Sequence, residues 1–113
     1  MIFILEDSPH RIKWFEDNFG KENIFCTCDY HEAIEKLSSE EYDEIYLDFN
    51  ISDPKHNGID VAFDMVDYEL QKDVLVIIHS DDNYGIRNML RILGKTHQVE
   101  DITFNKLIKM SGE

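Results

Sequence analysis

Basic residues are scarce in this chain of 113 residues, which has 11 Lys and Arg against 24 Asp and Glu and a formal net charge of −13. Such a surface repels nucleic-acid phosphates and anionic membranes, so we expect neither nucleic-acid binding through a basic patch nor membrane binding. A solvated acidic surface is the commoner origin of this charge, and it also suits a basic protein partner.

Long apolar runs and cysteines are also few. The N-terminal sequence MIFILEDSPHR is apolar for only five residues, too short for a signal peptide or a membrane span, and no longer apolar run follows. Cys26 and Cys28 are too close in the chain for a favourable disulfide, and the five histidines are scattered singly rather than at zinc-ligand spacing. We expect a cytoplasmic protein whose cysteines are reduced and pack as small apolar residues.

What the chain does have is a regular alternation of strand-like and helix-like segments. A hydrophobic content of 42% excludes disorder, and the length fits one domain spanning residues 1–113. Short apolar segments predict strands at residues 1–5, 24–28, 44–47, 74–78 and 99–104. Apolar residues at helical spacing predict a helix after each strand, the first of them starting at Ser8 and Pro9 and the last one short.

Strands that alternate with helices form parallel units with right-handed crossovers. The sequence therefore predicts an α/β fold: a flavodoxin-like, receiver-like three-layer sandwich with a five-stranded parallel sheet of order 2-1-3-4-5. In this architecture ligands bind beyond the carboxyl ends of the strands. The residues that directly follow each strand are therefore the ones that indicate function.

Ionisable or hydroxyl side chains follow four of the expected strands: Glu6 and Asp7, Asp48, His79 and Ser80, and Lys106. Carboxylates that converge in one cleft repel one another unless a cation neutralises them, and hard oxygen ligands with an open position suit Mg²⁺. A phosphate would then bind to Ser80, Lys106 and the amides near Asn83 and Gly85. Each position alone is more typical of a helix cap or a turn than of a site, and their shared edge is what favours a site.

These positions resemble the receiver domain of two-component response regulators. That family has an acidic pair after strand one, a phosphoacceptor Asp after strand three, a Ser or Thr after strand four and a Lys after strand five. Glu6, Asp7, Asp48, Ser80 and Lys106 stand in those places. The resemblance spans essentially the whole chain and implies a stand-alone receiver. The chain departs from it in a longer loop after Asp48 and in lacking the proline that usually follows the lysine.

A narrower resemblance is to the cyclic-phosphate-processing receiver domains, an offshoot that carries an H-S-x-N-x-x-G pattern after strand four, with a Met four residues later. The matching residues here are His79, Ser80, Asp82, Gly85 and Met89, and LEDSP is similar to that family's LDDERP-like segment. Ordinary receivers usually have an aliphatic residue where His79 stands. After strand three the family tends to show L-D-H-D and this chain has LDFN, so the second histidine and the second acid are missing.

The site predicted on this basis has three parts. The metal ligands for Mg²⁺ are Glu6, Asp7, Asp48 and the backbone carbonyl of Asn50. The phosphate-binding residues are Ser80, Lys106, Asn83 and Gly85. The catalytic candidates are His79, Ser80 and Asp48, with His79 as the general acid or base that opens a phosphodiester. A lone histidine at the end of a core strand is also typical of a hydrogen-bonded structural group.

Three hypotheses about function stay open. In the first, a Mg²⁺-dependent acidic pocket binds or processes cyclic phosphates or cyclic nucleotides, in its enzymatic form as a metal-dependent phosphoesterase. In the second, Asp48 accepts a phosphoryl group from a histidine kinase or a small phosphodonor. In the third, the chain is a non-catalytic acidic module that binds a protein partner, and its pocket is degenerate.

Overall fold

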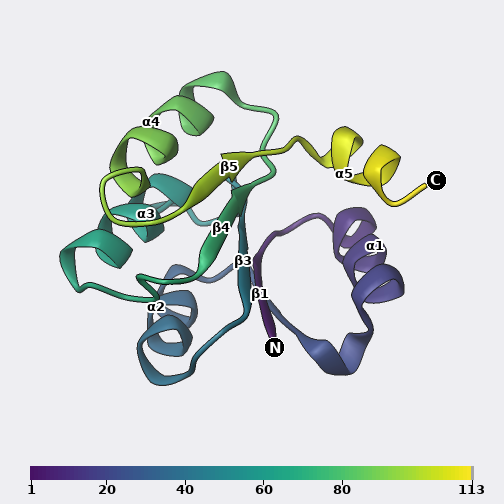
Figure 1. The fold of residues 1–113 in the computed structure, drawn as a ribbon, viewed down its shortest axis with the longest axis horizontal. Coiled ribbons are helices and arrows are strands. Elements are labelled where there is room, and N and C mark those ends of the chain that lie inside the picture. The colour runs from purple at the N-terminus through teal and green to yellow at the C-terminus, as the bar shows by residue number, and fades with distance from the viewer. Residues whose placement is uncertain (113) are drawn as a thin grey trace.

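The chain folds around a parallel five-stranded sheet of order β2-β1-β3-β4-β5, with helices on both faces (Figure 1). The computed structural model describes residues 1–112. The strands are β1 Ile2–Leu5, β2 Ile24–Thr27, β3 Glu44–Leu47, β4 Leu75–Ile78 and β5 Val99–Asp101. The helices are α1 Pro9–Phe19, α2 Tyr30–Ser39, α3 Gly58–Asp67, α4 Asn83–Leu93 and α5 Phe104–Met110, with a 3₁₀ turn, η1, at Lys21–Asn23. The predicted fold class and strand order are confirmed.

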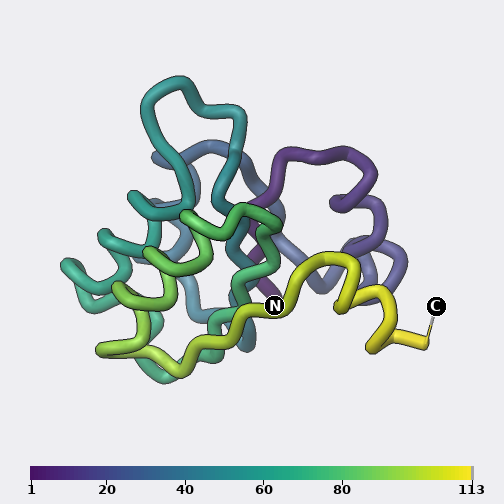
Figure 2. The backbone as a smooth tube through the Cα atoms, turned by 90° about the horizontal axis from the view of Figure 1, so that it is seen from above, coloured from purple at the N-terminus to yellow at the C-terminus, as the bar shows by residue number. Residues whose placement is uncertain are grey.

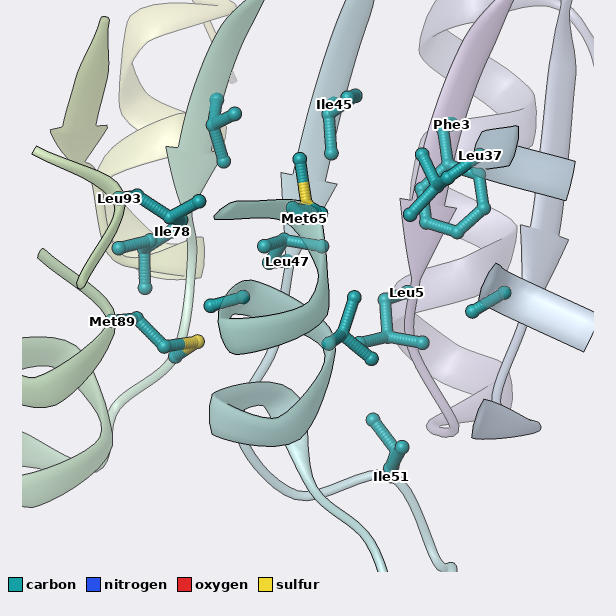
Figure 3. Packing of buried hydrophobic residues seen from close by; sticks show 14 of the residues in the cluster. Phe3, Leu5, Leu37, Ile45, Leu47, Ile51, Met65, Ile78, Met89 and Leu93 are labelled. Carbon is teal, nitrogen blue, oxygen red and sulfur yellow. The ribbon is translucent and has the colours of Figure 1, made fainter. Parts of the chain in front are cut away.

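Two apolar cores lie on opposite faces of the sheet, because successive side chains of a strand point to opposite sides. Helices α2, α3 and α4 cover the larger core, where Leu5, Leu47, Met65 and Met89 pack together (Figure 3). Helices α1 and α5 cover the smaller core on the other face. None of the helices within residues 1–112 is long and apolar enough to cross a membrane.

Helices α1, α3 and α4 begin at the carboxyl edge of the sheet, and polar caps fix where they start. Ser8 caps α1, Asn57 caps α3 in a reciprocal pair with Asp60, and Asp82 caps α4. Such caps satisfy the free amides of a first helical turn. Seen from above, the purple segment after β1 and the teal loop after β3 lie at the same end of the molecule (Figure 2).

Two expectations about local structure are wrong. The fifth strand ends at Asp101 rather than at residue 104, because the Thr103 side chain accepts a hydrogen bond from the Lys106 amide and starts α5 at Phe104. The cysteines do not both pack as small apolar residues: Cys26 is half-buried, but Cys28 lies beyond the end of β2 and is exposed. Both thiols are free, as expected.

Candidate functional site

Strand alternation brings three ionisable side chains together. The core residues under α1 and α5 include one from each of three neighbouring strands: Ile4, Tyr46 and Ile77. Two residues further along each strand, Glu6, Asp48 and His79 project from the same face. The Asp48 amide donates to the Leu5 carbonyl at 3.1 Å and the His79 amide to the Leu47 carbonyl at 3.0 Å, so the sheet's hydrogen bonding continues to these residues.

Glu6 and His79 form a buried polar pair. Nε2 of His79 lies 2.8 Å from Oε1 of Glu6, and the two side chains are 0% and 1% exposed. The imidazole packs edge-on against Phe15, with ring centroids 5.3 Å apart, and Nδ1 has no hydrogen-bond partner among the described residues. The His79 imidazole is therefore buried between Glu6 and the Phe15 ring of the smaller core.

Glu6 is stabilised as a carboxylate. Burial alone raises the pKa of Glu6, but the hydrogen bond from His79, the Ser8 amide and the charge of Arg11 together hold the pKa below its usual value. Its Oε2 accepts hydrogen bonds from the amides of Asp7 and Ser8, each at 3.1 Å. These two amides directly follow Glu6 in the chain, so the turn into α1 is shaped around the Glu6 carboxylate.

Asp48 shows the opposite shift. Burial and the neighbouring charge of Glu6 raise the pKa of Asp48 to about 6, against the lowering effects of His79, the Phe49 amide and Arg11. Its Oδ1 accepts a hydrogen bond from the Phe49 amide at 2.8 Å. Two adjacent carboxylates whose pKa values are pushed apart are typical of functional sites.

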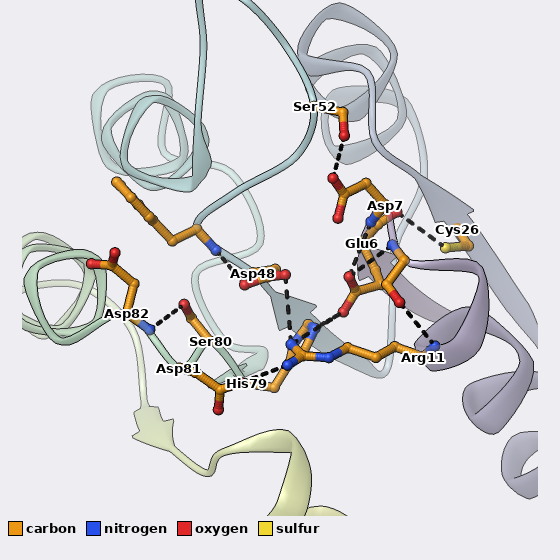
Figure 4. Close-up of polar contacts among 12 residues, drawn as sticks. Glu6, Asp7, Arg11, Cys26, Asp48, Ser52, His79, Ser80, Asp81 and Asp82 are labelled. Atoms are coloured by element: carbon orange, nitrogen blue, oxygen red, sulfur yellow. Dashed lines mark hydrogen bonds and ion pairs between the residues drawn. The ribbon is translucent and has the colours of Figure 1, made fainter.

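Arg11 reaches into this cluster from the first turn of α1 (Figure 4). One guanidinium nitrogen lies 3.9 Å from Glu6 and 3.8 Å from Asp48, and the other lies 2.5 Å from Asp81. Neither Arg11 nor Asp81 is among the site residues predicted from the sequence. The available signal was position: Arg11 follows the Ser8 cap on a helix that starts at the carboxyl edge of the sheet, so its side chain is within reach of the strand ends.

A cavity of about 290 Å³ opens over these residues. Glu6, Asp7, Asp48, Asn50 and Ser80, all predicted site residues, line it. Asp7 faces a different part of the wall from Glu6, since it accepts a hydrogen bond from Ser52 in the loop after β3 (Figure 4). The structure thus brings all four predicted metal ligands to one cavity.

Of the predicted phosphate-binding residues, Ser80 alone lines the cavity. Ser80 is 1% exposed, and its Oγ accepts a hydrogen bond from the Asp82 amide at 3.0 Å. The Gly85 amide, predicted to bind phosphate, donates to Asp82 at 2.8 Å, while Asn83 is an exposed first residue of α4. Lys106 is exposed on α5, and neither it nor His79 lines the cavity.

Two glycines allow α3 and α4 to approach the segment after β3. A Cβ atom at Gly58 would lie 2.1 Å from the Asp48 carbonyl oxygen, and one at Gly85 would lie 2.4 Å from Cγ of Phe49. Neither distance is possible for a real side chain without a shift of the neighbour. The glycine in the H-S-x-N-x-x-G-like pattern therefore has a packing explanation: it makes room for Phe49.

Glu6, Asp48 and His79 also form a group that is compact enough for a metal ion, since one ligand atom from each lies within 4.8 Å of the others. This set differs from the predicted one, because it includes the imidazole and leaves out Asp7 and Asn50. Carboxylate oxygens suit Mg²⁺, whereas a nitrogen ligand suits transition metals better. Two overlapping ligand sets thus share Glu6 and Asp48.

Comparison with known proteins places the chain in a family. The model of the cyclic-phosphate processing receiver domain matches residues 1–95. The chain belongs to this family. The family matches the narrower of the two resemblances found in the sequence, and that identification is confirmed. No curated protein matches the chain.

Solved receiver structures share the fold of this receiver domain at low sequence identity. The phosphorylated cyanobacterial phytochrome response regulator RcpA is 21% identical, with a TM-score of 0.71, over 97% of this chain and 86% of that one. The response regulator TrrA of Thermotoga maritima, in complex with Mg²⁺ and BeF, is 20% identical, with a TM-score of 0.67, over 98% of this chain and 95% of that one. These likenesses establish the fold.

Proposed function

We propose that this receiver domain binds a cyclic phosphate together with Mg²⁺ in the cavity over Glu6 and Asp48. The observation that carries the proposal is the pair of buried carboxylates in one cavity, with a guanidinium 3.8 and 3.9 Å from them. Two carboxylates held this close attract a cation, and a cation in turn attracts a phosphate. The family's cyclic-phosphate chemistry supplies the ligand class.

The residues present suit Mg²⁺. The ion prefers carboxylate oxygens and usually keeps several waters, so it needs an open site. Glu6, Asp7 and Asp48 present carboxylates to a cavity of about 290 Å³, which leaves room for water and a phosphate. These three residues would hold the ion, together with Asn50 on the same wall. When bound, Mg²⁺ polarises a phosphoryl oxygen.

The protein's own residues bind and orient the ligand. Glu6 is fixed by His79 and by two backbone amides, so its carboxylate does not rearrange. Opening a cyclic phosphodiester adds water across one P–O bond: the water oxygen bonds to phosphorus, and the leaving oxygen takes a proton. Asp48 faces the cavity, where its carboxylate is one of the groups that would hold the ion. The buried imidazole of His79 instead supports a positioning role through Glu6.

The proposal is tested with 2′,3′-cyclic AMP followed by ³¹P NMR, with and without Mg²⁺. We expect Mg²⁺-dependent line broadening for binding, and the appearance of a monoester signal if the ring is opened. Asp48→Ala should abolish both effects, whereas Asp73→Ala, which removes an exposed carboxylate outside the cavity, should abolish neither. Unchanged spectra at saturating Mg²⁺ would contradict the proposal.

A second candidate function is phosphoryl transfer to Asp48. It is favoured by the place of Asp48 directly after β3 on the wall of the cavity, and by the fold shared with TrrA, whose structure contains Mg²⁺ and BeF. The same pocket would serve both functions, since both need a cation beside a phosphate. Detection of a covalent phosphate on Asp48 distinguishes them.

A further inference from the structure

We propose that Arg11 is the phosphate-binding cation of this pocket, and that it neutralises Glu6 and Asp48 until a divalent ion takes over that task. The inference rests on the proposed function and assigns a role to a residue that the sequence patterns did not indicate. The guanidinium would compete with Mg²⁺ for the carboxylates but would help to bind the phosphate. Loss of Arg11 should therefore raise the affinity for Mg²⁺ and lower the affinity for phosphate, and the two affinities can be measured separately.

The position of Arg11 supports the first role. Its guanidinium lies 3.9 Å from Glu6 and 3.8 Å from Asp48, too far for direct hydrogen bonds but close enough for strong attraction in a partly buried site. Both carboxylates are almost fully buried, so the screening by water that weakens surface ion pairs is reduced here. A divalent ion between the same carboxylates would repel Arg11. The carboxylates would then no longer need the positive charge of Arg11.

Two contacts hold the guanidinium at the cavity when the carboxylates are occupied. Asp81, in the segment after β4, binds one nitrogen at 2.5 Å, and the ring of Phe104 lies below the group with its centroid 4.9 Å from Cζ. The Arg11 side chain is 22% exposed and lines the cavity. A planar guanidinium fixed at its edge and face still has donors available, and its fork matches phosphate oxygens.

Lys106, the cation that the receiver pattern indicates, does not lie at this cavity. The early end of β5 places Lys106 inside α5, where it is exposed and does not line the cavity. Arg11 is the residue among those lining this cavity that carries a full positive charge. The cavity thus has a cation from α1, whereas the receiver pattern indicates one after strand five.

The charge of the cavity also sets an order of binding. Its wall carries five acidic side chains and one arginine, so a phosphate alone is repelled: the acids are Glu6, Asp7, Asp48, Asp81 and Asp82. A divalent ion must therefore bind before the phosphate does. Inorganic phosphate should show no binding without Mg²⁺ and measurable binding with it.

Isothermal titration calorimetry of Arg11→Gln tests both roles, with Arg87→Gln as the matched control. Arg87 is exposed on α4 and does not line the cavity, so its loss gives the same net charge without touching the site. We expect Arg11→Gln to bind Mg²⁺ roughly tenfold more tightly than the wild type, and inorganic phosphate at saturating Mg²⁺ roughly tenfold more weakly. Arg87→Gln should change neither affinity by more than about twofold.

The outcomes separate this inference from the proposed function. If Arg11→Gln and Arg87→Gln behave alike, or if Lys106→Gln weakens phosphate binding more than Arg11→Gln does, the role of Arg11 is overturned while the Mg²⁺ pocket stands. If neither the wild type nor Arg11→Gln binds Mg²⁺, the proposed function itself fails. Should Arg11→Gln not fold, Arg11→Lys decides: weaker phosphate binding with little change in Mg²⁺ affinity supports the inference, and unchanged phosphate binding overturns it.

Discussion

Nε2 of His79 lies 2.8 Å from Oε1 of Glu6, with both side chains shielded from water. Removing one partner leaves the other buried without its hydrogen bond, so we expect His79→Ala to lower the free energy of unfolding by about 2–4 kcal/mol. Urea denaturation measures this. In a variant with both Glu6→Leu and His79→Leu neither member of the pair is left buried without the other, so the double variant should cost less than the sum of the two single leucine variants. Additive costs would contradict a coupled pair.

The same substitution distinguishes positioning from proton transfer. If His79 acts through Glu6, then Mg²⁺ affinity and any turnover per folded molecule should fall together in His79→Ala. If the imidazole is a general acid or base, turnover should fall by about 10²–10⁴-fold while Mg²⁺ affinity is kept. We expect the first result, because the His79 ring is fully buried and does not line the cavity. Calorimetry and a turnover assay on one preparation separate the two.

Asp48 should make the free energy of unfolding depend on pH. Its pKa is raised from 3.8 to about 6 in the folded state, so its contribution to stability is fully present below about pH 4 and is lost as the pH rises through about 6. Asp48→Asn removes this loss and should be more stable than the wild type by about 1–3 kcal/mol at pH 7 without divalent ions. The difference should vanish near pH 4.

Urea unfolding at pH 4, 5.5 and 7, with a chelator present, checks the sign of the Asp48 effect. The exposed Asp73, changed to Asn, is the control and should shift stability by less than about 0.5 kcal/mol at each pH. A wild-type protein that gains stability relative to Asp48→Asn between pH 4 and pH 7 would show that Asp48 is stabilised as a carboxylate. That result would contradict the burial argument.

Phosphorylation of Asp48 should be weak. A carboxylate must be free to attack a phosphoryl donor, and here Asp48 is buried next to Arg11. Lys106 is not at the cavity to receive the transferred group. We expect intact-mass spectra after treatment with acetyl phosphate and Mg²⁺ to show no stoichiometric adduct. An adduct that is absent from Asp48→Asn would make the signalling function the better one.

The two close-packed glycines should respond differently to an added methyl group. Gly85→Ala places Cβ against the Phe49 side chain and should cost about 1–3 kcal/mol, part of which Phe49→Ala restores by making room. Gly58→Ala places Cβ against the Asp48 carbonyl, where truncating Phe49 gives no relief. Thermal unfolding of both single and both double variants measures this. If Phe49→Ala also restored the stability of Gly58→Ala, the Asp48 carbonyl would not be the group that an added methyl at residue 58 meets.

Much of the fold and part of the site could be predicted from the sequence because local patterns determined them. Alternating apolar segments predicted the parallel sheet, and its topology placed Glu6, Asp48 and Ser80 at one edge. The two-residue period of a strand then put His79 on the same face as the two acids. These features depend on chain order and side-chain direction, which a sequence shows directly.

Two features were not predicted from the sequence: the early end of β5 and the place of Arg11 at the cavity. The first depends on competition between strand and helix, and the second on the direction of a long side chain. The Thr103 cap ended β5 early and carried Lys106 into α5, although the residues from Val99 onwards also suit a strand. Arg11 reaches the acidic pair through a long side chain whose direction is decided by Asp81 and Phe104, from distant parts of the chain. Tertiary contacts of this kind leave no local pattern.

The buried carboxylates of Glu6 and Asp48 should form a divalent-cation site. Isothermal titration of Mg²⁺ into the wild type, Asp48→Ala and the surface control Asp73→Ala at pH 7.5 measures this. We predict saturable binding of one ion per chain in the wild type and in Asp73→Ala, and its loss in Asp48→Ala. If Asp48→Ala binds Mg²⁺ as the wild type does, or if the wild type binds no Mg²⁺, then Glu6 and Asp48 do not form such a site.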